Sequence, residues 1–84
     1  MMTTTHSVLL YTKEGCPLCE EARRMLSRLG RRYPMRVTEV DIASDEALLR
    51  RYRDTIPVIE VDGVLTLGGR IDEAELREWL EETP

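Results

Sequence analysis

The stretch SVLLYTKEGCPLCEEARRMLSRLG, residues 7–30, joins a short apolar run, two closely spaced cysteines and an amphipathic segment. The run Ser7–Tyr11 has the length and composition of a β-strand, and its continuous apolar character predicts burial on both faces. From Pro17 to Leu29 apolar residues recur at helical spacing, with charged residues on the opposite side, and Gly30 suits a helix end. The stretch therefore predicts a strand and a helix with the cysteines at their junction.

A second strand and a second helix follow. The segment Met35–Ile42 is rich in β-branched residues, which favours a strand. Ser44 or Asp45 is suited to cap a helix that runs through Tyr52. Pro57 disfavours helix at the residue before it, so the next strand should begin at Val58.

The C-terminal part of the chain has the pattern of a hairpin and a helix. The sequence VIEV-DG-VLTL, residues 58–67, predicts two antiparallel strands joined at Asp62-Gly63. Asp72 is suited to cap the last helix, with Glu75 placed to bond back to it. The helix would bury a stripe formed by Ile71, Leu76, Trp79 and Leu80.

The order of these elements is βαβαββα. A strand–helix–strand unit makes its two strands parallel with a right-handed crossover, whereas the hairpin strands are antiparallel. We therefore expect an α/β fold in which a four-stranded mixed sheet carries three helices. At 84 residues the chain should be one domain, residues 1–84, with flexible residues 1–5.

The composition excludes several classes of protein. Of the residues, 42% are hydrophobic and 33% charged, as in an ordinary globular domain rather than a disordered or fibrous chain. The net charge is −4, and no basic stripe with interleaved aromatics is present, which argues against a nucleic-acid partner. The first ten residues lack the features of a signal peptide, and no apolar run is long enough to cross a bilayer, so we expect a cytoplasmic protein with no membrane partner.

The two cysteines are placed for redox chemistry. With the helix beginning at Pro17, Cys16 is the N-cap residue and Cys19 lies one turn further on the same face. The helix dipole and the unpaired N–H groups favour the Cys16 thiolate, so its pKa should fall below the free value of roughly 8.5. Lys13 adds to this effect, while the acidic residues Glu14, Glu20 and Glu21 oppose it. Cys16 would then be the nucleophile and Cys19 the resolving thiol.

Two other uses of the pair remain open from the residues alone. A zinc site would have Cys16, Cys19 and at most His6 as ligands, which is short of four. A purely structural disulfide would close a very small loop and add little stability.

Three motifs together resemble the glutaredoxins of the thioredoxin superfamily, and the compact bacterial glutaredoxin-like proteins most closely. They are Lys13-Glu14-Gly15-Cys16-Pro17-Leu18-Cys19, Thr55-Ile56-Pro57 and Gly68-Gly69-Arg70-Ile71-Asp72. They occur in the family's order, and the resemblance covers roughly residues 7–82. It implies a thioredoxin-like fold and a thiol–disulfide oxidoreductase.

The resemblance also implies roles for residues outside the cysteine pair. Pro57 would be a cis-proline facing the cysteines, and Ile56 would offer its backbone N–H and C=O to a thiol substrate. Lys13 would help to hold a glutathione carboxylate, and the segment Gly69–Asp72 the other end of glutathione. Glutaredoxins usually carry an aromatic residue where this chain has Leu18.

We therefore expect catalysis by Cys16 and Cys19, with glutathione as a co-substrate and no resident cofactor. The substrate would be a disulfide-containing protein or a glutathione mixed disulfide, and a flavoprotein reductase is another source of electrons. We expect a monomer. The alternative is a metal-binding or iron–sulfur module that uses the cysteine pair without redox turnover, the cluster being shared across a dimer with glutathione.

Overall fold

The computed structural model describes residues 5–83. The elements occur in the predicted order βαβαββα. The strands are β1 (His6–Thr12), β2 (Met35–Asp41), β3 (Val58–Val61) and β4 (Leu65–Gly68). The helices are α1 (Pro17–Gly30), α2 (Glu46–Tyr52) and α3 (Glu73–Glu82), and a single 3₁₀ turn at Ile42–Ser44 follows β2. The prediction of a flexible segment at residues 1–5 falls, for residues 1–4, outside the described residues.

The four strands form one mixed sheet in the order β2-β1-β3-β4. β1 and β2 are parallel, and β3 is antiparallel to both of its neighbours. The predicted parallel first pair and antiparallel last pair are thus confirmed. Because β1 is one of the two inner strands, the cysteine loop that follows it lies near the middle of one end of the sheet.

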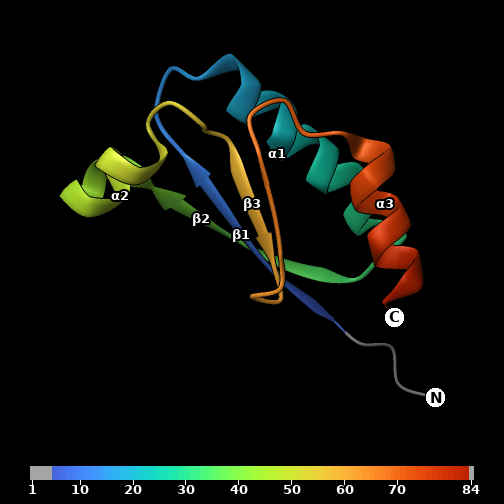
Figure 1. The fold of residues 1–84 in the computed structure, drawn as a ribbon. Coiled ribbons are helices and arrows are strands. Elements are labelled where there is room, and N and C mark those ends of the chain that lie inside the picture. The colour runs from blue at the N-terminus through green and yellow to red at the C-terminus, as the bar shows by residue number, and fades with distance from the viewer. Residues whose placement is uncertain (1–4, 84) are drawn as a thin grey trace.

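The hydrophobic core lies between one face of the sheet and the two longer helices. Figure 1 shows α1 and α3 on the same side of the sheet and α2 apart from them, near the C-terminal ends of β1 and β2. Val8 and Leu10 of β1 point into this core and are 1% and 0% exposed. The helices contribute apolar residues at helical spacing, which are Ala22, Met25, Leu26 and Leu29 of α1 and Leu76 and Leu80 of α3.

The opposite face of the sheet is only partly covered, which corrects the expectation that β1 is buried on both faces. Leu9 and Tyr11 are half-buried, because α2 has seven residues and none of them is fully buried. The ring of Tyr52 in α2 lies 4.7 Å from the ring of Tyr11 and covers that end of the strand. The run SVLLY is continuously apolar, yet only one of its faces has a full layer of helices.

Asp72 caps α3 as predicted, and of the two candidates Ser44 and Asp45 it is Asp45 that caps α2. Asp45 accepts hydrogen bonds from the N–H groups of Ala47 and Leu48 at the start of α2. Asp72 does the same for Ala74 at 2.9 Å and Glu75 at 3.4 Å in α3. Within residues 5–83 the return bond expected from the Glu75 side chain to Asp72 does not form. A single aspartate carboxylate thus caps each of these two helices.

The hairpin has a three-residue turn, Asp62-Gly63-Val64, instead of the expected two-residue turn. Val61 pairs with Leu65, and Val64 is 75% exposed. A two-residue turn would pair Val61 with Val64 and shift β4 by one residue, which would turn its two leucines away from the core. The observed register packs Leu65 and Leu67 against the core instead. Burial of the two leucines therefore decides the turn length.

None of the helices in the described part of the chain is both long and apolar enough to span a bilayer.

Candidate functional site

The cysteine pair lies where the chain leaves the central strand and enters α1. A loop of three residues, with Gly15 at φ 79°, turns the chain from β1 to Cys16. Cys16 is the N-cap residue and Pro17 the first residue of the helix, as predicted. Cys16 and Cys19 form a disulfide, with their Cα atoms 5.2 Å apart. The structure therefore represents the oxidised form of the pair.

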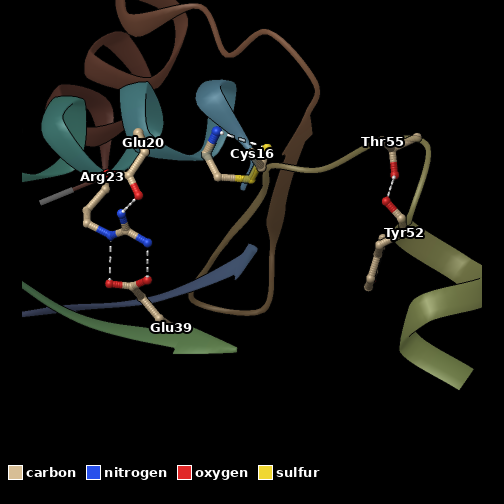
Figure 2. The surroundings of a disulfide bond; sticks show 7 residues. Cys16, Glu20, Arg23, Glu39, Tyr52 and Thr55 are labelled. Carbon is tan, nitrogen blue, oxygen red and sulfur yellow. Dashed lines mark hydrogen bonds and ion pairs between the residues drawn. A yellow bond between two sulfur atoms is a disulfide. The ribbon is translucent and has the colours of Figure 1, made fainter. Parts of the chain in front are cut away.

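The sulfur of Cys16 occupies the place of a capping oxygen. It accepts a hydrogen bond from the N–H of Cys19 at 3.2 Å, which Figure 2 shows. The carbonyl of Cys16 accepts the first helical bond, from Glu20. A helix N-terminus favours negative charge at this position, so the same contact stabilises a thiolate once the disulfide is reduced.

The two sulfur positions differ in access. Cys16 is half-buried, whereas Cys19 is 1% exposed and faces the core with the apolar side of α1. A substrate disulfide can therefore reach Cys16 and not Cys19. This difference supports the assignment of Cys16 as nucleophile and Cys19 as resolving thiol.

One of the three acidic side chains near Cys16 has a basic partner. Glu20 forms an ion pair with Arg23, and Arg23 also binds both oxygens of Glu39 in β2, at 2.9 and 2.6 Å (Figure 2). These bonds raise the pKa of Arg23, and the bond from Arg23 lowers the pKa of Glu39. Because Arg23 has one positive charge and binds two carboxylates, this group of three side chains keeps one negative charge. Lys13 and Glu14 are exposed on the loop before Cys16.

The cis-proline lies at the same end of the sheet as the cysteines. The Ile56–Pro57 bond is cis, and Pro57 is buried. Val58, the next residue, pairs with Tyr11 near the end of β1, so the proline is brought beside the strand that leads into the cysteine loop. The resemblance to glutaredoxins implied this placement, and the pairing of β3 with β1 produces it.

The backbone just before the cis-proline is anchored to the end of α2. The carbonyl of Tyr52, at the end of α2, accepts hydrogen bonds from the N–H of Thr55 at 2.9 Å and of Ile56 at 3.0 Å. It also accepts the hydroxyl of Thr55 at 3.2 Å, a contact drawn in Figure 2. A substrate that pairs with the N–H of Ile56 must therefore replace the bond to Tyr52.

Gly69 and Asp72 have structural roles in the fold. The N–H of Gly69 donates to the carbonyls of Thr55 at 2.7 Å and Pro57 at 2.9 Å, so it holds the cis-proline segment against the chain after β4. Gly69 has φ 72°, a conformation that glycine adopts without strain. One oxygen of Asp72 caps α3. Glutathione contacts of these residues and of Lys13 stay predictions.

His6 lies away from the cysteines. It begins β1, whereas the cysteine loop follows the end of that seven-residue strand, roughly 20 Å further along at about 3.3 Å per residue. Its Nδ1 lies 2.7 Å from Oδ2 of Asp62, and its ring is 5.8 Å from the ring of Trp79. The zinc site that combined His6 with Cys16 and Cys19 is therefore wrong. Among residues 5–83 no group of three or more histidine, cysteine or acidic residues is placed to hold a metal ion.

The sequence did not reveal a groove beside the cysteine pair. This groove has a volume of about 340 Å³ and lies between α1 and the segment that joins β4 to α3. Leu18 and Gly69, from two of the three motifs, are on its two walls. The helical spacing of Leu18, Ala22 and Met25 marks the wall in α1. The opposite wall comes from residues some 45 positions away, which no local pattern connects to α1.

Comparisons with known proteins agree with this geometry. Residues 7–81 match the family described as "Glutaredoxin-like domain (DUF836)". Protein XcR50 of X. campestris is 30% identical, with a TM-score of 0.73, 92% of this chain covered and 99% of that chain. Protein Ne2328 of Nitrosomonas europaea is 25% identical, with a TM-score of 0.80 and 94% and 95% covered. A mutant thioredoxin of Halobacterium salinarum is 20% identical with a TM-score of 0.72, 94% of this chain and 74% of that chain being covered, and it shows the likeness of fold alone.

Proposed function

This chain belongs to the glutaredoxin-like family of the thioredoxin superfamily, and we propose that it is a thiol–disulfide oxidoreductase that reduces disulfides through Cys16 and Cys19. The family, the thioredoxin-like fold and the close cysteine pair support a thiol redox function. The observation that carries the proposal is the contrast between the two cysteine residues. Cys16 is accessible and caps α1, whereas Cys19 is buried one turn away.

The reaction proceeds by two exchanges. The Cys16 thiolate attacks one sulfur of the substrate disulfide, the substrate S–S bond breaks, and the leaving thiolate takes up a proton. This step leaves a mixed disulfide between Cys16 and the substrate. The Cys19 thiolate then attacks the Cys16 sulfur, which releases the second substrate thiol and forms the Cys16–Cys19 disulfide. Two electrons pass from the protein dithiol to the substrate.

The chain around the pair orients these steps. Pro17 starts the helix and so fixes Cys16 at the N-cap. The segment Ile56–Pro57 would align the substrate backbone beside Cys16, with the carbonyl of Ile56 as acceptor and its N–H available after the bond to Tyr52 opens. The N–H of Gly69 donates hydrogen bonds to the carbonyls of Thr55 and Pro57, and these bonds keep the segment in place.

The oxidised protein needs a reductant with two electrons. We propose glutathione as co-substrate, two molecules of which would convert the Cys16–Cys19 disulfide to the dithiol and leave as glutathione disulfide. Lys13 and the start of α3 at Asp72 would bind its carboxylates and ammonium group. A flavoprotein reductase is the other source of electrons. We further propose that the substrate is a protein disulfide or a glutathione mixed disulfide and that the protein acts as a monomer in the cytoplasm.

The assignment of the two cysteines is tested by substitution. We expect Cys16→Ser to abolish reduction of a protein disulfide. Cys19→Ser should accumulate a mixed disulfide with the substrate, visible by mass spectrometry under non-reducing conditions. Ser27→Ala, an exposed position on α1 away from the pair, is the control and should retain full activity. Equal activity of the two cysteine variants would refute the assignment.

A second measurement addresses the chemistry of the thiolate. The reduced protein is alkylated with iodoacetamide over a range of pH, and the modification of Cys16 and Cys19 is followed separately. Cys16 should react faster than free cysteine at neutral pH, and Cys19 should react slowly because it is buried. If freshly purified protein carries iron with visible absorption and reduces no disulfide, the cluster-binding alternative is supported instead.

A further inference from the structure

The groove adjoins the proposed catalytic site, and the residues that line it include neighbours of Cys19 and of the cis-proline segment. One wall begins at Leu18, which lies between Pro17 and Cys19. The other begins at Gly69, whose N–H donates a hydrogen bond to the carbonyl of Pro57. Figure 1 shows the segment between β4 and α3 passing beside the first turns of α1. A chain bound at Cys16 would therefore have its neighbouring residues at the mouth of the groove, since one residue spans about 3.3–3.6 Å.

Four of the side chains that line the groove are apolar. Ala22 and Met25 of α1 are 3% and 5% exposed, so the apolar surface that a ligand can reach comes mainly from Leu18 and Ile71, which are half-buried. The volume of about 340 Å³ is at the small end of the range in which pockets hold organic groups, roughly 300–1,000 Å³. Leu18, which lines the groove, stands where glutaredoxins usually have a larger, aromatic residue.

The rim is charged and has an excess of positive charge. Arg28 of α1 and Glu73 of α3 form an ion pair at 2.7 Å that crosses the groove and neutralises both. The remaining charged residues on the rim are Arg24, Arg70 and Glu21. Within residues 5–83 neither of these two arginines forms an ion pair. The groove thus has a surplus cation on a chain whose net charge is −4.

We propose that this groove binds the residues that flank the reacting cysteine in a protein substrate, and that it selects a segment in which an apolar side chain is followed by an acidic one. The inference rests on the proposed function and names the substrate class of that site. The apolar side chain would pack on Leu18 and Ile71, and the carboxylate would lie between Arg24 and Arg70. Apolar side chains in the walls together with basic residues at the rim are complementary to such a segment.

The test uses peptides whose single cysteine is joined by a disulfide to a small neutral thiol. Each peptide has the pair Leu-Glu, Leu-Gln or Leu-Lys beside the cysteine, in one set after it and in a second set before it. The kcat/KM for reduction is measured at low and high ionic strength. In at least one set Leu-Glu should exceed Leu-Gln by about threefold to tenfold at low ionic strength, the range that one or two exposed ion pairs supply. Added salt should reduce the difference.

Substitutions locate the selection in the groove. Arg24→Gln combined with Arg70→Gln should remove the preference for Leu-Glu, mainly through KM. Arg31→Gln is the matched control, since Arg31 is an exposed arginine at the end of α1 that does not line the groove. Leu18→Tyr should fill the space and lower kcat/KM for all peptides that contain leucine, relative to peptides with glycine at that position.

A small neutral disulfide separates failure of the inference from failure of the proposed function. If the protein reduces 2-hydroxyethyl disulfide but treats Leu-Glu, Leu-Gln and Leu-Lys alike in both sets, the groove does not select acidic segments and the inference is wrong. The same holds if the preference survives in the double arginine variant. If the protein reduces neither the small disulfide nor any peptide, the proposed function itself fails.

Discussion

Replacing Asp62 with glycine removes the carboxylate that joins the start of β1 to the turn between β3 and β4. Oδ2 of Asp62 binds Nδ1 of His6 at 2.7 Å, and Oδ1 accepts the N–H of Ser7 at 2.8 Å. The His6 side chain is 4% exposed, so it has little access to water once the carboxylate is lost. The contact joins residues 56 positions apart and closes the end of the sheet that lies opposite the cysteines.

The expected loss of stability follows from this burial. A buried polar group left without its partner costs about 1–3 kcal/mol, whereas the exposed Ser7 N–H turns to water at little cost. The backbone adds little, because Asp62 has φ 52°, which glycine adopts freely, while glycine also gains entropy in the unfolded chain. We therefore expect Asp62→Gly to lower the free energy of unfolding by about 1–3 kcal/mol. Each kcal/mol lost should lower Tm by about 4–8 °C.

The measurement is urea unfolding at neutral pH followed by circular dichroism, with two control variants. Asp62→Asn keeps an acceptor for the His6 ring and tolerates the positive φ, so it should lose less than Asp62→Gly. Asp54→Gly removes a carboxylate that is 91% exposed and should have an effect below about 1 kcal/mol. The reduction of disulfides per folded molecule should be unchanged in Asp62→Gly, since the contact is remote from Cys16. An unfolding free energy for Asp62→Gly within about 0.5 kcal/mol of the wild type would refute the reasoning.

Four further outcomes are expected. The stability difference between the wild type and Asp62→Gly should narrow below about pH 4. Hydrogen bonds from His6 and Ser7 lower the pKa of Asp62 in the folded state, so the stability that the Asp62 carboxylate contributes is lost as the pH falls through that pKa. Unfolding of both proteins measured over a range of acid pH would test this. Ile59→Ala, at a position 0% exposed, should cost about 2–5 kcal/mol in urea unfolding. Gly69→Ala should cost about 1–2 kcal/mol because φ is 72° there, while Gly30→Ala, in α1, should not destabilise. Glu39→Gln should leave stability within about 1 kcal/mol, since its ion pair with Arg23 is exposed, as thermal unfolding would show.

The site was predictable to the extent that its chemistry is local. The order strand, Cys-Pro-Leu-Cys, helix places Cys16 at the N-cap and Cys19 one turn later through helical geometry alone, and both positions are confirmed. The cis bond at Pro57 followed from the resemblance to glutaredoxins, and the structure contains it. Engagement of the Ile56 N–H by Tyr52 was not predicted, because no pattern in the sequence links the end of α2 to the backbone of the cis-proline loop.

Short-range interactions let the sequence alone determine the order of elements, the cap at Asp72 and the position of the cysteine pair. They also narrowed the cap of α2 to Ser44 or Asp45. Each of these depends on residues within a turn or two of one another, so the local pattern contains the information. The tertiary structure decided the turn at Asp62–Val64, the one-sided burial of β1, the His6–Asp62 contact and the groove next to Leu18. These features arise when segments far apart in the chain pack together. Their geometry follows from which apolar side chains the whole core can bury at once, and no local pattern specifies that choice.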